Sequence, residues 1–167
     1  MDSPLAAEFR AQALFRLEES TRMCRRALEV LPEAALWQRP NEASNSVGNL
    51  LLHLRGNMRQ YIHAGLGGQP DVRERDAEFA ARGGYTKAEL WAALEQTVAE
   101  ACDIIRHADE PNLLRVRRVQ GFSLSGLGLV LHVVEHYSYH TGQIAFWVKQ
   151  LQNADLGFYA DFDLNAK

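Results

Sequence analysis

The stretch from about residue 123 to 152 constrains the fold more than any other part of the sequence. It contains no proline, and as an α-helix it carries apolar side chains on more than one side. A helix that is apolar nearly all round is buried on several sides. We therefore expect this segment to be the central element of a helical domain and also a subunit contact. One apolar stripe consists of Leu127, Val130, Val134, Ile144, Val148 and Leu151, while Leu129, Val133, Tyr137 and Trp147 lie on other sides.

Three further helices are predicted over 4–31, 46–66 and 87–107, because apolar residues recur there at steps of three and four. The last of these has the clearest start signal, since Thr86 and Glu89 have the spacing of a capping box. Four helices longer than average favour a bundle over a mixed fold. The predicted fold class is therefore all-α, a four-helix bundle with essentially no sheet.

The connections between these helices are longer than tight turns. Residues 32–45, 67–85 and 108–122 are interpreted as loops that can cross the ends of the bundle. The tail, 153–167, carries three aromatic residues and is expected to pack back onto the bundle or onto a partner chain. A length of 167 residues fits one domain, so we expect a single domain over 1–167.

Composition and charge exclude several classes of partner. The formal charge of -3 and the pI of about 6.1 disfavour nucleic-acid binding and a polybasic membrane attachment. Apolar runs fall short of the ~20 residues of a membrane span, and the N-terminus does not resemble a signal peptide. Cys24 and Cys102 lie in separate helical patterns and indicate buried thiols in a reducing compartment. We expect the cytoplasm, a small-molecule substrate and no membrane.

The chemistry of the chain is concentrated in its histidines. His132, His136 and His140 repeat every four residues, and residues four apart lie on one side of a helix within reach of one metal ion. His132 and His140 are about 12 Å apart along the axis and cannot share an ion easily. Spacing therefore leaves two pairs open, His132 with His136 or His136 with His140, and a third ligand must come from another helix. His53 lies at the flank of its helix, and Asn57, one turn on, is placed to orient it.

Other polar groups are interpreted as solvent-facing. His63 and His107 fall near helix ends, where we expect surface imidazoles. The basic run Arg115, Arg117 and Arg118 is interpreted as a solvated loop rather than a carboxylate site.

Four short segments resemble the DinB-like family of small four-helix metalloproteins. Members of that family look alike in having one histidine in the second helix and a His-x-x-x-His pair in the fourth, followed by a Gly-Gln-Ile-like segment. The matching segments are WQRP (37–40), NSVGNLLLHL (45–54), HVVEH (132–136) and HTGQI (140–144).

The resemblance assigns the metal to His53, His136 and His140 and leaves His132 outside the ligand set. It implies a left-handed four-helix bundle, often dimeric, and we expect a homodimer. Related members include S-transferases and isomerases that depend on a low-molecular-weight thiol. The implied cofactors are a divalent ion (Zn, Ni or Fe) and a thiol cosubstrate.

Three neutral imidazoles leave a coordination position open, which is the ligand count of a catalytic site. Two function classes follow: a metal-dependent transferase or hydrolase, and a non-catalytic metal-binding bundle that stabilises the fold or senses a ligand. The sequence assigns no catalytic residue. Asn57, Glu135 and Gln143 are the groups expected to support the ligands or to contact a substrate.

Overall fold

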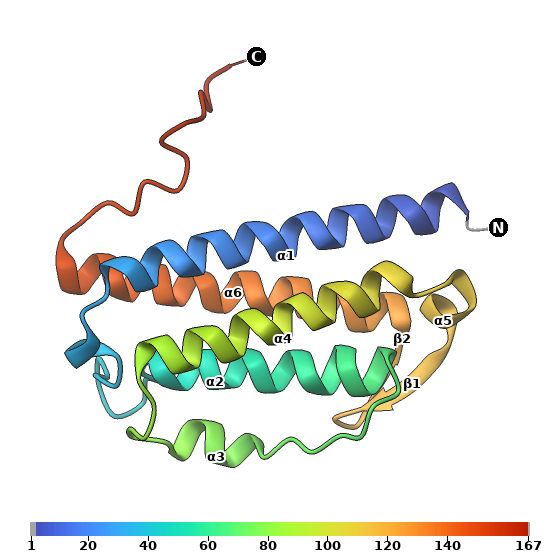
Figure 1. Ribbon diagram of the computed structural model, residues 1–167, viewed down its shortest axis with the longest axis horizontal. Coiled ribbons are helices and arrows are strands. Elements are labelled where there is room, and N and C mark those ends of the chain that lie inside the picture. The colour runs from blue at the N-terminus through green and yellow to red at the C-terminus, as the bar shows by residue number, and fades with distance from the viewer. Residues whose placement is uncertain (1–2, 167) are drawn as a thin grey trace.

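Four long helices form the body of the protein in a computed structural model that describes residues 3–166. They are α1 (Pro4–Val30), α2 (Val47–Met58), α4 (Lys87–His107) and α6 (Gly126–Gln152). α1 packs along α6 and also against α4, while α2 packs against α4 and α6 (Figure 1). The predicted all-α bundle is confirmed.

Helix α2 does not end at Met58. It continues as a π-helix, η2 (Arg59–Leu66), so that one rod runs along the bundle from Val47 to Leu66. π-helical turns are rare and occur often near functional sites. The rod carries His53 in its first part and Tyr61 and His63 in its second part.

The helix starts follow the capping residues of the sequence. Thr86 and Glu89 make the predicted capping box at α4. At α2 the cap is Ser46, which forms a second capping box with Asn49. Ser46 therefore caps this helix, which begins at Val47.

The core is one continuous cluster of apolar side chains between the four helices. It includes two complete tyrosine rings, Tyr61 and Tyr137, both almost without solvent exposure. Cys24 and Cys102 are buried and not in a disulfide, and burial raises the pKa of their thiols to about 12 and about 11. The largest fully buried aliphatic side chains are Leu17, Leu31, Leu36, Leu51, Leu54, Met58, Ile62, Leu94, Ile105 and Leu113.

The connections contain more structure than the loops we expected. The first has a 3-10 turn, η1 (Glu33–Ala35), and the second contains the short helix α3 (Arg75–Ala80). The third contains α5 (Glu110–Leu114) and an antiparallel hairpin of β1 (Val116–Val119) and β2 (Phe122–Ser125).

The hairpin corrects the prediction of essentially no sheet and moves the start of the last helix from 123 to 126. Its turn is made by Gln120 and Gly121, both with positive φ, the conformation that matches the twist of two antiparallel strands. Ser125 pairs with Val116 and also caps α6. The strands are too short for their alternation to stand out in the sequence.

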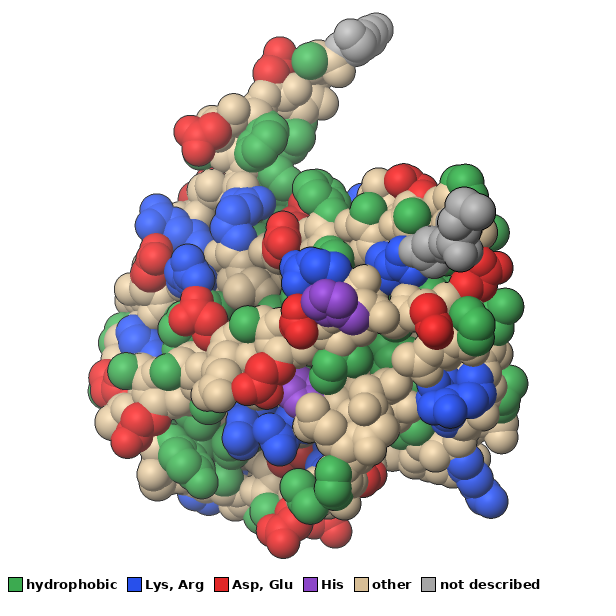
Figure 2. All heavy atoms as spheres, turned by 45° about the vertical axis from the view of Figure 1, so that its right-hand side comes forward, with side chains coloured by type: hydrophobic (Ala, Val, Ile, Leu, Met, Phe, Trp, Pro, Cys, Tyr) green, Lys and Arg blue, Asp and Glu red, His purple; other side chains and the backbone are tan. Residues whose placement is uncertain are grey.

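The tail leaves α6 at Asn153, whose left-handed conformation ends the helix. Leu156 is fully buried, and the carbonyl oxygen of Phe158 accepts a hydrogen bond from Arg22 on α1. The tail then projects from the body, with Phe162 exposed (Figures 1 and 2). The first half of the tail thus packs back as expected.

Acidic and basic side chains are intermixed on the face of the molecule that Figure 2 presents. Within residues 3–166, no helix combines the length and the apolar character that crossing a membrane requires.

Candidate metal centre

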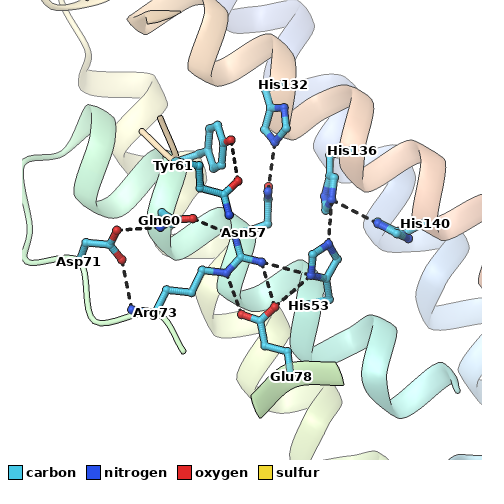
Figure 3. A network of polar contacts seen from close by, with 11 residues as sticks. His53, Asn57, Gln60, Tyr61, Asp71, Arg73, Glu78, His132, His136 and His140 are labelled. Atoms are coloured by element: carbon cyan, nitrogen blue, oxygen red, sulfur yellow. Dashed lines mark hydrogen bonds and ion pairs between the residues drawn. The ribbon is translucent and has the colours of Figure 1, made fainter. Parts of the chain in front are cut away.

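Helices α2 and α6 bring three imidazoles together in the middle of the bundle (Figure 3). The Nε2 atom of His136 lies 3.0 Å from Nε2 of His53 and 3.2 Å from Nε2 of His140. Ligand atoms of all three residues lie within 4.8 Å of one another. His53 and His140 are buried and His136 is half-buried, so the cluster belongs to the interior of the bundle.

The two outer rings have partners that determine which nitrogen carries the proton. His53 Nδ1 lies 2.9 Å from Glu78 Oε2 and 3.1 Å from Arg73 Nη2, and His140 Nδ1 lies 2.7 Å from Gln143 Oε1. A carboxylate oxygen and an amide oxygen only accept, so we assign the proton of each ring to Nδ1. An imidazole that donates from Nδ1 has its lone pair on Nε2. Both lone pairs therefore point toward His136.

The two Nε2 separations that involve His136 fit a shared metal ion. Two ligands with bonds of about 2.1 Å stand about 3.0–3.4 Å apart at ordinary coordination angles. The two measured Nε2 separations fall in that range. His136 Nδ1 is buried and has no hydrogen-bond partner within residues 3–166. A lone pair on Nε2 and a proton on Nδ1 of His136 would complete the ligand set.

Burial keeps the imidazoles of His136 and His140 neutral, which is the form that binds metal. Desolvation, followed by the charges of His140 and His53, lowers the pKa of His136 to about 3. Desolvation is also the main reason why the pKa of His140 lies below its ordinary value. Both α6 imidazoles are therefore neutral at neutral pH.

A buried ion pair, which we did not predict, holds His53 from the other side. Arg73 donates to both carboxylate oxygens of Glu78, at 2.8 and 2.9 Å, and Glu78 contacts His53. Burial alone raises the pKa of Glu78, but hydrogen bonds from Arg73 and His53 outweigh it, so the pKa lies below its usual range. A carboxylate on the outer nitrogen of a metal-binding histidine orients the ring and makes it more basic.

Both residues of this ion pair come from the connection that we interpreted as a loop. Arg73 precedes α3 and Glu78 lies within it, and tertiary packing brings both onto α2. The sequence contained one indication of this contact. Gly56 lies three residues after His53, and an isolated glycine within a helical pattern can mark a position where another segment packs closely against the helix.

His132 has partners away from the cluster. Its Nε2 accepts from Asn57 Nδ2 at 3.1 Å, and its ring stacks on Tyr61 at 4.0 Å between centroids. Asn57, which we expected to orient His53, therefore contacts His132 instead. Geometry favours His136 with His140 over the alternative pair.

Of the other expected supporting groups, Gln143 contacts His140, while Glu135 makes no such contact. Glu135 is exposed and lines a hollow of about 500 Å³ on the surface of α6. His136 and Tyr139 line the same hollow. The hollow gives small molecules a route to one side of the cluster.

The expectation for His63 was wrong, and that for His107 was right. His63 is only 2% exposed, because η2 continues the rod and turns this residue toward α4, where Nε2 contacts the carbonyl oxygen of Thr97 at 3.2 Å. His107 is exposed at the end of α4. In the basic run Arg115 and Arg118 are exposed, while Arg117 bonds back to Asn112.

The fold and the histidine cluster together define a helical bundle with a candidate three-histidine site. The model of the family described as "Protein of unknown function (DUF1572)" matches residues 4–159, so the chain belongs to that family. No curated protein matched the sequence.

Two solved structures share the fold. A DinB-like protein from Bacillus subtilis is similar with a TM-score of 0.66 and 16% identity, over 86% of this chain and 94% of that one. A mutant of mycothiol-dependent maleylpyruvate isomerase is also similar, with a TM-score of 0.66 and 16% identity. That match covers 81% of this chain but only 60% of the isomerase chain. At these identities the likeness shows the fold alone.

Proposed function

We propose that this protein binds a divalent metal ion through the Nε2 atoms of His53, His136 and His140 and uses it as an enzyme. One observation carries the proposal: three imidazole nitrogens converge, and the protons of the two outer rings are held by Glu78 and Gln143. Such a set is neutral and rich in lone pairs, and a cation satisfies it better than water alone.

The bound ion would supply Lewis-acid chemistry and lower the pKa of a bound water or thiol. Three imidazoles suit Zn, Ni and Fe alike. The protein's own residues prepare the ligands: Glu78 and Gln143 orient His53 and His140, and burial keeps the imidazoles of His136 and His140 neutral. The hollow beside His136 supports catalysis on a small molecule over a sealed structural site.

A low-molecular-weight thiol is the cosubstrate that we propose for a transferase reaction. Cys24 and Cys102 are buried and have raised pKa values, so neither provides a thiolate. The nucleophile would arrive with a cosubstrate, and the similar isomerase is described as mycothiol-dependent. Hydrolysis by a metal-bound water is the competing reaction at the same site. Cytoplasmic location, a single domain and the absence of a nucleic-acid partner stay predictions.

Metal content tests the ligand set. Protein purified without a His-tag is expected to contain about one divalent ion per chain. His53→Ala, His136→Ala and His140→Ala should each lose most of it. His132→Ala is the matched control, since this residue lies one turn from His136 on the same helix and should keep its metal. Loss of metal in the control with retention in His140→Ala would move the site one turn along α6.

Activity separates the two function classes. Metal-loaded protein should transfer one of several low-molecular-weight thiols to an electrophile, or hydrolyse a small ester, and His136→Ala should not. Full metal content with no turnover across such a panel would instead support the non-catalytic bundle.

A further inference from the structure

A second cavity lies under the segment 69–85, and neither His53 nor His136 lines it. Its volume is about 460 Å³, enough for a small metabolite. One wall is a single face of the α2–η2 rod, on which Arg55, Arg59 and His63 follow at four-residue steps. All three side chains line the cavity, and His63 also packs against α4.

The two arginines of this wall have no partner of their own. Within residues 3–166 neither guanidinium makes a hydrogen bond or an ion pair, and Arg55 Nε is buried without a partner. Both side chains are half-buried. Leaving such donors without a counter-charge is costly, and an anion would satisfy both guanidinium groups.

His63 contributes a hydrogen-bond acceptor rather than a donor. Its Nε2–H donates to the carbonyl oxygen of Thr97, so Nδ1 carries the lone pair. Nδ1 is buried and has no hydrogen-bond partner. The carboxylate oxygen Oε2 of Glu100 lies 3.6 Å from Nδ1 and cannot donate to it. Desolvation lowers the pKa of His63, with a smaller contribution from Arg59 and Arg55 in the same direction, so the ring is neutral. This position therefore lacks a donor.

Most carboxylates around the cavity already form hydrogen bonds or ion pairs with other residues. Glu78 is held by Arg73 and His53. Asp71 accepts from Gln60 and from the backbone N–H of Arg73. Glu74 is exposed. The cavity wall thus presents two cations without partners and one acceptor without a donor.

We propose that this cavity binds a small oxyanion, a carboxylate or a phosphate, that also carries a hydroxyl or N–H group. Arg55 and Arg59 bind the anion through charge-assisted hydrogen bonds, and His63 Nδ1 accepts from the hydroxyl or N–H. None of the three proposed metal ligands lines the cavity, although Glu78, which contacts His53, does.

Calorimetric titration with three probes tests this assignment. Inorganic phosphate and tartrate should bind in a saturable way, and tartrate about threefold to tenfold more tightly than succinate, which lacks the hydroxyls. Arg55→Gln combined with Arg59→Gln should weaken tartrate binding at least about tenfold. The matched control is Arg115→Gln with Arg118→Gln, which removes two exposed arginines that line a different cavity. It should bind as the wild type does.

Three results would overturn the proposal: no saturable binding at about 10 mM probe, equal loss in both double variants, or loss in the control alone. Repeating the titration with His136→Ala separates this site from direct coordination of the anion to a metal, since binding should persist there. In the wild type, the ¹⁵N signal of His63 Nδ1 should shift with tartrate and not with succinate. An unchanged signal with bound tartrate would remove His63 from the site.

Discussion

Gly56 lets an ion pair lie directly against the backbone of α2. A Cβ atom at this position would collide with Glu78 Oε1, 1.9 Å away, and would stand in tight contact with Arg73 Nε, 3.1 Å away. A glycine inside a helix costs about 0.5–1 kcal/mol of stability relative to alanine. Here the glycine leaves the room that Glu78 needs to reach His53.

Gly56→Ala is therefore expected to push Glu78 away from His53 and to weaken metal binding by about tenfold to a hundredfold. Glu78→Gln should have an effect of similar size. Gly142→Ala is the control, because its Cβ meets nothing within 4 Å, and it should keep the wild-type affinity. Affinity is measured by competition with a chelator. An unchanged affinity in Gly56→Ala would show that the Glu78 contact does not support the ligand.

At the scale of elements, Asn49 couples the start of α2 to α3. Its side chain completes the capping box with Ser46, and its Nδ2 donates to the carbonyl oxygens of Glu78 and Ala81, both at 2.9 Å. The same residue that begins the helix carrying His53 therefore also fixes the short helix carrying Glu78.

Asn49→Ala should lower both stability and metal affinity. Loss of the cap costs about 1 kcal/mol of unfolding free energy, and release of α3 loosens Glu78. Thr86→Ala is the matched control, since it breaks the other capping box, at α4, and should cost about the same stability without changing metal affinity. Urea unfolding and chelator competition measure the two effects. Equal metal affinity in the two variants would contradict this coupling.

For the molecule as a whole, the buried imidazoles make stability depend on pH. Desolvation holds the pKa of His136 at about 3 and lowers those of His132 and His140, whereas unfolded imidazoles protonate near 6.5. Below that value the unfolded chain binds more protons than the folded chain. The stabilising contribution is complete above about pH 6.5 and declines as the pH falls.

In metal-free protein, the free energy of unfolding should therefore fall between about pH 6.5 and 5, by up to about 1 kcal/mol per pH unit after solvent screening. His136→Gln should flatten this slope, and His107→Gln, at an exposed position, should leave it as in the wild type. Urea denaturation in the presence of a chelator, repeated at several pH values, measures this dependence of the unfolding free energy on pH. A wild-type stability that stays constant over this range would contradict the expected effect.

The outer face of α6 supports the predicted homodimer. Leu131, Tyr139 and Phe146 are each more than half exposed on it, and large exposed apolar groups are often covered by a partner. We expect a dimer in sedimentation equilibrium, and Phe146→Glu should shift it toward monomer. A wild-type monomer at micromolar concentration would rule this assembly out.

The sequence by itself determined the elements that depend on local chemistry. Apolar periodicity and capping residues predicted the four long helices, since these signals act over a few neighbouring residues. The hairpin and α3 were missed because elements this short carry little periodicity. Spacing on the last helix limited the metal pair to two alternatives, and the resemblance to DinB-like proteins chose His136 with His140.

Only the tertiary structure decided which residues contact the histidines. The contact of His53 with Glu78 joins positions 25 residues apart, and that of His53 with His136 joins positions 83 apart. No local sequence pattern encodes a contact between positions so far apart in the chain. The burial of His63 likewise depends on how η2 meets α4. Packing places these polar groups because most buried donors and acceptors find a partner in the folded chain, wherever that partner lies in the sequence.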